Sequence, residues 1–129
     1  MSEEERPARQ PAITTHTLSL SSGDLTYEAR ADWITLHKDD EPSAEVFHVA
    51  YTLQDGGQRP VTFVFNGGPG AASAYLHLGV VGPRRVYFPE DGSLPPSPAR
   101  VIDNEDTWLK FTDLVFIDPV TTGYSRAAD

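Results

Sequence analysis

The sequence predicts an α/β fold, in which antiparallel opening strands lead into a strand that is followed by a loop and a helix. The strongest observation is the short run of β-branched and aromatic residues at Pro60–Phe65, bounded by a proline and by glycines as a buried strand often is. The second is that Ala71–Leu78, after these glycines, has no strand alternation and is rich in helix-tolerant residues. A helix is therefore expected to follow the strand.

The segments before residue 60 predict an antiparallel meander. Residues 1–12 are charged, contain proline and show no periodicity, so a disordered arm is expected there and an ordered domain over residues 13–129. Strand signals separated by turn residues follow at Ile13–Leu20, Leu25–Leu36 and Glu45–Gln54. The middle segment is read either as one strand or as two strands with a break at Ala31-Asp32.

The glycine-rich stretch after Phe65 predicts a loop that approaches a ligand closely. Asn66, Gly67, Gly68 and Gly70 remove side-chain bulk where backbone N–H groups could reach an external oxygen, such as a developing oxyanion. The alternative is a type I′ hairpin turn at Asn66-Gly67 that joins two strands. The helix-tolerant residues that follow favour the loop.

Two ordered motifs resemble those of the serine carboxypeptidases, peptidase family S10, which have an α/β-hydrolase fold. The first is Asn-Gly-Gly-Pro-Gly at residues 66–70, followed by small residues and Ser73. The second is Asp113–Ser125, which is similar to the next core strand of that family and its Asp-Pro-Val-Gly-x-Gly-(Phe or Tyr)-Ser loop. Between them, Asn104–Phe111 is similar to the family's Asn-x-x-x-Trp segment. The resemblance covers Pro60–Ser125, about half of the chain.

The resemblance implies that residues 13–129 are the N-terminal portion of an α/β-hydrolase domain, with opening antiparallel strands and a mostly parallel sheet that is incomplete. It implies a serine-type carboxypeptidase, which hydrolyses C-terminal peptide bonds, takes peptide substrates and needs no cofactor or metal. Gly68, with Gly67 beside it, is then the backbone donor to the oxyanion. Asn66 is the residue that binds the terminal carboxylate of the substrate. The expected partner is the missing C-terminal portion of the domain.

Three positions depart from the family pattern. Val64 stands where many members have tryptophan and Ala71 replaces a common cysteine, and these two departures leave the substrate preference open. Thr121 replaces the first glycine of the second motif, which alters the expected turn of that loop but touches no expected catalytic atom.

A catalytic serine is not recognisable in this chain. The nearest pattern to the Gly-x-Ser-x-Gly elbow surrounds Ser125, but four residues separate its glycine from the preceding strand. Ser73 is expected to cap or pack the helix, and Asp118, in an Asp-Pro pair, to shape a turn. Since this fold orders its triad as Ser, Asp and then His, all three are expected beyond residue 129. The chain alone is expected to be inactive.

The remaining candidates point to structural roles. His16, His37 and His48 lie in predicted strands at intervals that suggest no metal site, and His77 lies near the loop but precedes any nucleophile. Gly82–Arg100 contains five prolines and predicts an irregular surface excursion, either a pocket rim or a plain connector.

The composition excludes some functions. Nineteen acidic and ten basic residues give a net charge of −9, which disfavours nucleic-acid binding. The absence of cysteine excludes disulfides and thiol nucleophiles within these residues. The chain has no signal peptide pattern and no apolar run of membrane-spanning length, so a cytoplasmic location without a membrane partner is expected.

Two other functions stay open beside the carboxypeptidase. One is a non-catalytic remnant that binds peptides without cleaving them. The other is a different α/β-hydrolase, an esterase or a proline aminopeptidase, in which His-Gly-Gly-Pro-Gly serves the same purpose. Asn66 in place of that histidine argues against the second alternative.

Overall fold

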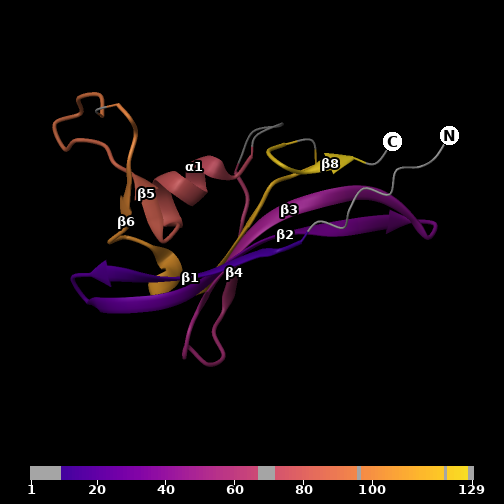
Figure 1. The fold of residues 1–129 in the computed structure, drawn as a ribbon, viewed down its shortest axis with the longest axis horizontal. Coiled ribbons are helices and arrows are strands. Elements are labelled where there is room, and N and C mark those ends of the chain that lie inside the picture. Colours follow the sequence, from indigo (N-terminus) through magenta and orange to yellow (C-terminus); the bar gives the residue numbers. More distant parts are fainter. Residues whose placement is uncertain (1–9, 67–71, 96, 121, 128–129) are drawn as a thin grey trace.

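The main sheet joins a long antiparallel meander to one parallel strand pair. The computed structural model describes residues 10–66, 72–95, 97–120 and 122–127. The spatial order of the sheet is β1 (Ala12–Leu20), β2 (Gly23–Lys38), β3 (Glu41–Leu53), β7 (Asp113–Ile117) and β4 (Val61–Val64), with β8 (Arg126–Ala127) paired to β3. Figure 1 shows β2 and β3 as a long curved ribbon from which the rest of the molecule extends.

The antiparallel meander is confirmed, and its second strand is continuous. The break considered at Ala31-Asp32 is absent, because Ala31 pairs with Val49 and Asp32 with His48 on β3. The Asp32 carboxylate keeps this position in the strand by accepting the Trp33 N–H at 2.8 Å. The meander therefore provides an unbroken platform for β7.

The hairpin between β2 and β3 turns on two aspartates. Asp39 and Asp40 both have positive φ, 51° and 63°. A two-residue type I′ turn requires positive φ at both central residues, and aspartate tolerates that conformation better than most side chains. The two strands therefore continue to this turn and are longer than the sequence predicts.

The strand at residues 60–65 does not form a hairpin. β4 pairs in parallel with β7, from Val61 opposite Asp113 to Val64 opposite Phe116. The next described elements are α1 (Ala74–Leu76) and the π-helical turn η1 (His77–Val81), as the loop interpretation predicts. A sheet-rich chain with a mixed sheet and few helical residues is compatible with an incomplete α/β domain.

The core lies between the sheet and the helical segment. It comprises Leu18, Leu20, Tyr27, Val64, Val81, Leu109, Leu114 and Phe116, all buried. Three of these, Val64, Leu114 and Phe116, alternate along β4 and β7 on the face that α1 and η1 cover. This packing sets the position of the helical segment relative to the ends of the parallel strands.

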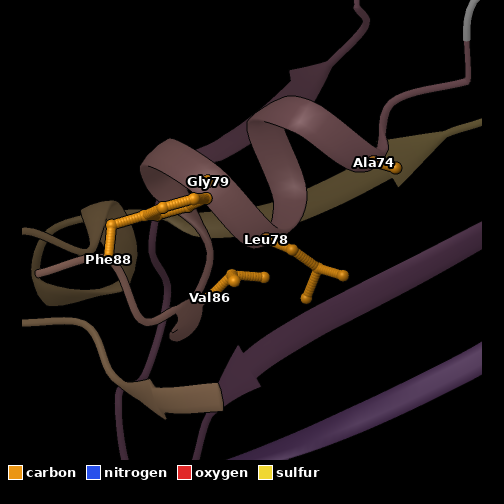
Figure 2. Close-up of a pocket in the computed structure, with 5 residues that line it drawn as sticks. All are labelled: Ala74, Leu78, Gly79, Val86 and Phe88. Atoms are coloured by element: carbon orange, nitrogen blue, oxygen red, sulfur yellow. The ribbon is translucent and has the colours of Figure 1, made fainter. Parts of the chain in front are cut away.

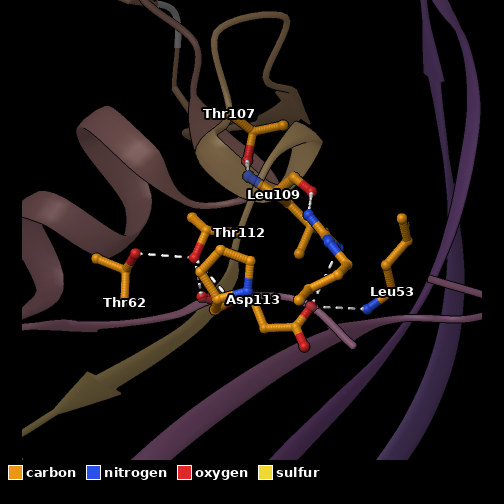
Figure 3. Close-up of polar contacts among 8 residues, drawn as sticks. Leu53, Thr62, Thr107, Leu109, Thr112 and Asp113 are labelled. Atoms are coloured by element: carbon orange, nitrogen blue, oxygen red, sulfur yellow. Dashed lines mark hydrogen bonds and ion pairs between the residues drawn. The ribbon is translucent and has the colours of Figure 1, made fainter. Parts of the chain in front are cut away.

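A polar network holds the beginning of β4 against the beginning of β7. Arg59 lies 3.0 Å from the Asp113 carboxylate and also donates to the Leu109 carbonyl. Asp113 in addition accepts the Leu53 N–H at 3.3 Å, and the hydroxyls of Thr62 and Thr112 lie 2.8 Å apart (Figure 3). Because one carboxylate contacts both the end of β3 and Arg59, the connection between β3 and β4 is fixed.

The proline-rich excursion is anchored at both ends. Its strand β5 (Arg84–Val86) pairs with β6 (Val101–Asp103), so Gly82–Arg100 is less irregular than expected. The buried Asn104 donates through Nδ2 to the carbonyls of Val80 and Gly82, both at 2.9 Å. Asn104 therefore ends the helical segment, because it donates hydrogen bonds to the last carbonyl groups there. The motif that begins at Asn104 continues into the 3-10 turn η2 (Trp108–Lys110).

Candidate functional site at the ends of the parallel strands

The candidate site lies where β4 and β7 end. The register of the pair places Val64 beside Phe116, so Asn66 follows one strand and Asp118 the other at the same edge of the sheet. Ligands of α/β folds bind at the carboxyl ends of parallel strands. Asn66 is half-buried here. The predicted oxyanion donors Gly67 and Gly68 lie outside the described residues, as do Ala71 and Thr121.

Asp118 ties the beginning of the helical segment to the end of β7. Its Oδ1 accepts hydrogen bonds from both the backbone N and the Oγ of Ser73, each at 3.2 Å. Both side chains are buried, with Ser73 2 % and Asp118 9 % exposed. Ser73 makes no side-chain cap within the helix, so its hydroxyl serves this cross-link instead. The cap expected as one role of Ser73 is absent, and both residues instead make this structural contact.

Ser125 is a structural residue and not an exposed nucleophile. It is fully buried, its Oγ donates to the Asp118 carbonyl at 2.6 Å, and the same Oγ accepts the Phe47 N–H at 2.7 Å. A hydroxyl held on both sides by backbone groups cannot approach a substrate. The loop after β7 is thereby fixed to β3.

His77 is a buried neutral histidine. Its Nε2 is hydrogen-bonded to the Tyr51 hydroxyl, and its ring stacks on Phe116 with centroids 4.3 Å apart. Burial lowers the pKa of His77 to about 4, and the nearby Asp118 carboxylate only partly opposes this shift. The same burial raises the pKa of the Tyr51 hydroxyl above its usual range. At neutral pH, His77 therefore packs as an uncharged aromatic side chain.

The other histidines lie away from the site. His16 and His37 are exposed, and His48 is half-buried on β3 with an Nδ1 that has no hydrogen-bond partner among the described residues. No cluster of three or more metal-ligating side chains occurs in the described part of the chain. Nor do the described residues include a helix long and apolar enough to span a membrane.

A cavity of about 330 Å³ opens between the helical segment and the ends of the strands. Aromatic and apolar groups form most of its wall, and Ser73, His77 and Asp118 supply its polar groups. Its lining consists of Phe47, Val49, Ala72, Ser73, Ala74, His77, Phe116, Asp118, Gly123 and Tyr124. Tyr124 extends the aromatic wall outward, with its ring 5.1 Å from that of Phe47. The cavity lies directly beside the segment that follows the glycine-rich loop.

A second, apolar cavity of about 270 Å³ lies on the other side of the helical segment. Figure 2 shows Leu78 and Val86 facing each other, with Phe88 at one end and Ala74 at the other. Ala74 lines both cavities, so the first turn after the loop separates them. An apolar side chain could be accommodated here, whereas a charged group would have no partner among the residues that line it.

The cross-link between Ser73 and Asp118 is the feature that sequence reasoning missed. These residues lie 45 positions apart, and each belongs to a different motif. Neither motif alone indicates the contact, although the buried environment of both could be inferred from the small residues beside Ser73 and the strand before Asp118. The contact depends on the parallel pairing of β4 with β7.

Comparison with known proteins gives a consistent result. The family model described as serine carboxypeptidase matches residues 21–129. Similar curated proteins include the pheromone-processing carboxypeptidases KEX1 of three fungi. That of Cryptococcus gattii is 37 % identical over 83 residues, which cover 64 % of this chain and 12 % of the relative. That of Yarrowia lipolytica is 43 % identical over 70 residues, or 53 % of this chain and 10 % of the relative. That of Komagataella phaffii is 28 % identical over 131 aligned positions, which cover 100 % of this chain and 16 % of the relative.

Proposed function

This chain belongs to the serine carboxypeptidase family, and from that premise we propose that it supplies the oxyanion- and carboxylate-binding loop of a serine-type carboxypeptidase. The activity is hydrolysis of the C-terminal peptide bond of a peptide through an acyl-enzyme. The chain spans between 10 % and 16 % of the length of the curated relatives it matches. The serine, acid and histidine that perform the chemistry come from the remaining portion of such a domain.

The observation that carries this proposal is the common end of β4 and β7. The glycine-rich loop leaves β4 at Asn66, and Asp118 at the end of β7 holds the residue where the helical segment begins. The loop is thus attached at both of its ends to the edge of the sheet where α/β folds bind ligands. In this proposal, the reacting carbonyl meets the backbone donors of Gly67 and Gly68 at this edge.

The residue roles follow from the chemistry of the loop. Gly68, with Gly67 beside it, donates a backbone N–H to the oxyanion, and one such donor contributes about 3 kcal/mol to the transition state. The Asn66 amide binds the terminal carboxylate of the peptide. A neutral amide can do this without the desolvation cost of a buried charge.

The chain alone is inactive in this proposal. The hydroxyls of Ser73 and Ser125 are both committed to Asp118, and the imidazole of His77 is bonded to Tyr51. Neither of these two serines is therefore available for deprotonation by a histidine. The family match favours a carboxypeptidase over an esterase or a proline aminopeptidase.

A chimera tests the proposal. Residues 21–129 replace the matching segment of the Komagataella phaffii relative, whose alignment covers 100 % of this chain, and release of the last residue is measured on a panel of blocked dipeptides. The parent chimera is expected to release amino acids, whereas this chain alone releases none. Asn66→Ala in the chimera is expected to raise KM about tenfold, because a hydrogen bond to a charged group is lost.

Two outcomes would contradict the proposal. A folded chimera without activity would show that this segment cannot serve the reaction. An active chimera in which Asn66→Ala leaves KM unchanged would remove the carboxylate-binding role. If this chain alone bound the blocked dipeptides while the chimera stayed inactive, the non-catalytic remnant would be the better description.

A further inference from the structure

We propose that Asp118 is a positioning residue for the reaction, which fixes the C-terminal end of the glycine-rich loop through Ser73. This inference rests on the proposed function. Asp118 belongs to the second motif, Asp113–Ser125, and in this proposal it supports the loop that the first motif, at residues 66–70, forms. Asp118 does not touch the substrate in this proposal, since it acts through the backbone of Ser73.

The first step of the argument is that Asp118 is itself immobile. Its backbone N–H donates to the Phe47 carbonyl at 3.0 Å, and its carbonyl accepts the Ser125 hydroxyl at 2.6 Å. Both contacts connect it to β3 or to the loop that returns to β3. The carboxylate is therefore a fixed point at the edge of the sheet.

The second step is that the carboxylate makes contacts on both sides. Oδ1 receives the two hydrogen bonds from Ser73, and Oδ2 receives the Tyr124 N–H at 3.4 Å. The backbone of Gly123 comes so close to Oδ2 that a Cβ atom at this position would lie 2.0 Å away. With hydrogen bonds to both oxygens, the carboxylate is oriented with Oδ1 toward Ser73.

The third step concerns what Ser73 controls. Six residues, 67–72, separate it from Asn66, and the predicted oxyanion donors are among them. Asn66 follows β4 by two residues, and β4 pairs with β7, so the sheet sets where the N-terminal end of the loop begins. The C-terminal end has a backbone N–H at Ser73 that no helical carbonyl can accept, because it lies at the start of the segment. Asp118 accepts it and thereby sets the position of this end.

Because the sheet positions one end of the loop and Asp118 the other, we can predict which kinetic constant Asp118 affects. The oxyanion exists in the transition state and not in the bound peptide, so a misplaced donor lowers kcat. The carboxylate-binding Asn66 belongs to the end of the loop that the sheet holds, so KM is expected to change little. A displacement of about 1 Å at a reacting centre can cost about 100-fold in rate.

The experiment uses the chimera with three substitutions. Asp118→Ala is expected to lower kcat about 100-fold and to change KM less than threefold. Asp118→Asn keeps an oxygen that can accept from Ser73, so it is expected to recover most of the lost kcat. Arg59→Met, which disrupts a buried ion pair at the opposite end of β7, is the control for lost stability and is expected to keep kcat within threefold of the parent.

A kcat within threefold of the parent in Asp118→Ala would overturn the inference, as would an equal loss in Arg59→Met. A parent chimera without activity would count against the proposed function alone. In that case amide hydrogen exchange of the present chain decides the inference. Relative to the amides of the sheet core, the Ser73 amide is expected to lose protection at least tenfold in Asp118→Ala, whereas in Arg59→Met any loss at Ser73 is expected to match the loss at those core amides. Unchanged protection of Ser73 in Asp118→Ala would contradict the anchoring role.

Discussion

Gly123 leaves no room for a side chain beside Asp118: a Cβ atom at Gly123 would lie 2.0 Å from Oδ2 of the carboxylate. Gly123 also has a φ of 49°, which side chains adopt at a cost of about 1–2 kcal/mol. The glycine is thus required twice, once by its backbone conformation and once by the carboxylate. The two requirements can be separated, because Gly57 also has a positive φ but has no neighbouring atom that a Cβ would meet.

Gly123→Ala is expected to destabilise the chain by about 3 kcal/mol, since the new methyl group must displace Asp118 in addition to adopting a positive φ. The control is Gly57→Ala, where φ is 61° and a Cβ atom would meet nothing within 4 Å. That control is expected to cost about 1 kcal/mol. Urea unfolding of both variants measures the difference. Equal costs would mean that the Asp118 carboxylate does not limit position 123.

Arg59→Met is expected to destabilise the chain by about 3 kcal/mol, because it leaves the Asp113 carboxylate largely buried without its cation. The side chains of this pair are only 10 % and 17 % exposed. The control is Arg30→Met, whose pair with Asp32 is 46 % and 22 % exposed and is expected to contribute much less, because solvent screens an exposed pair. Thermal unfolding at low and high salt checks both expectations. A loss at Arg30 as large as that at Arg59 would contradict the assigned burial.

His77 makes stability depend on pH between about 4 and 6.5. Its pKa in the folded chain is lowered to about 4 by burial, whereas the unfolded chain has the ordinary value near 6.5. The unfolded state therefore binds more protons in this range, so stability falls as pH falls from about 6.5 to 4. The full loss is about 3 kcal/mol.

His77→Gln is expected to flatten this dependence, because glutamine can bond to Tyr51 but does not titrate. Urea unfolding of the parent and the variant at pH 7.5, 5.5 and 4.5 supplies the difference curve, in which the other titrating groups cancel. A difference curve without slope between pH 4 and 6.5 would mean that His77 is accessible to solvent.

The strands and the helix after the loop could be predicted because their signals are local. The apolar run at Pro60–Phe65 and the helix-tolerant residues after the glycines each identify one element without reference to the rest of the chain. The uninterrupted course of β2 could not be predicted, because aspartate disfavours strands. The hydrogen bond between the Asp32 carboxylate and the Trp33 N–H is visible only in the structure. The turn at Asp39-Asp40 could not be predicted either, because aspartate is only one of several residues that tolerate positive φ.

The site could be located from the sequence but not assembled. The two motifs give its residues in chain order, and the family they indicate is confirmed by the match over residues 21–129. The hydrogen bonds from Ser73 to Asp118 arise from parallel pairing between distant strands, which no periodicity in the sequence reports. The roles of Asn66, Gly67 and Gly68 and the cytoplasmic location stay predictions.

The outer face of β4 leads to a last prediction. Val61 and Phe63 lie on one face of this strand and Phe65 follows its end; they are 50 %, 60 % and 55 % exposed. Among the described residues β4 pairs with β7 alone, so one edge of it offers free backbone groups beside an apolar surface. Such an edge is a template for association with another chain.

The isolated chain is therefore expected to associate through β4 at micromolar concentration, and Phe63→Lys to reduce the association at least tenfold, because a charge on an edge strand opposes pairing. The control is Phe88→Lys, which removes an equally exposed phenylalanine, 59 % exposed, that lies beyond β5. Sedimentation velocity over a concentration series measures both variants. If Phe88→Lys reduced association as much as Phe63→Lys, general apolar exposure and not the edge of β4 would be responsible.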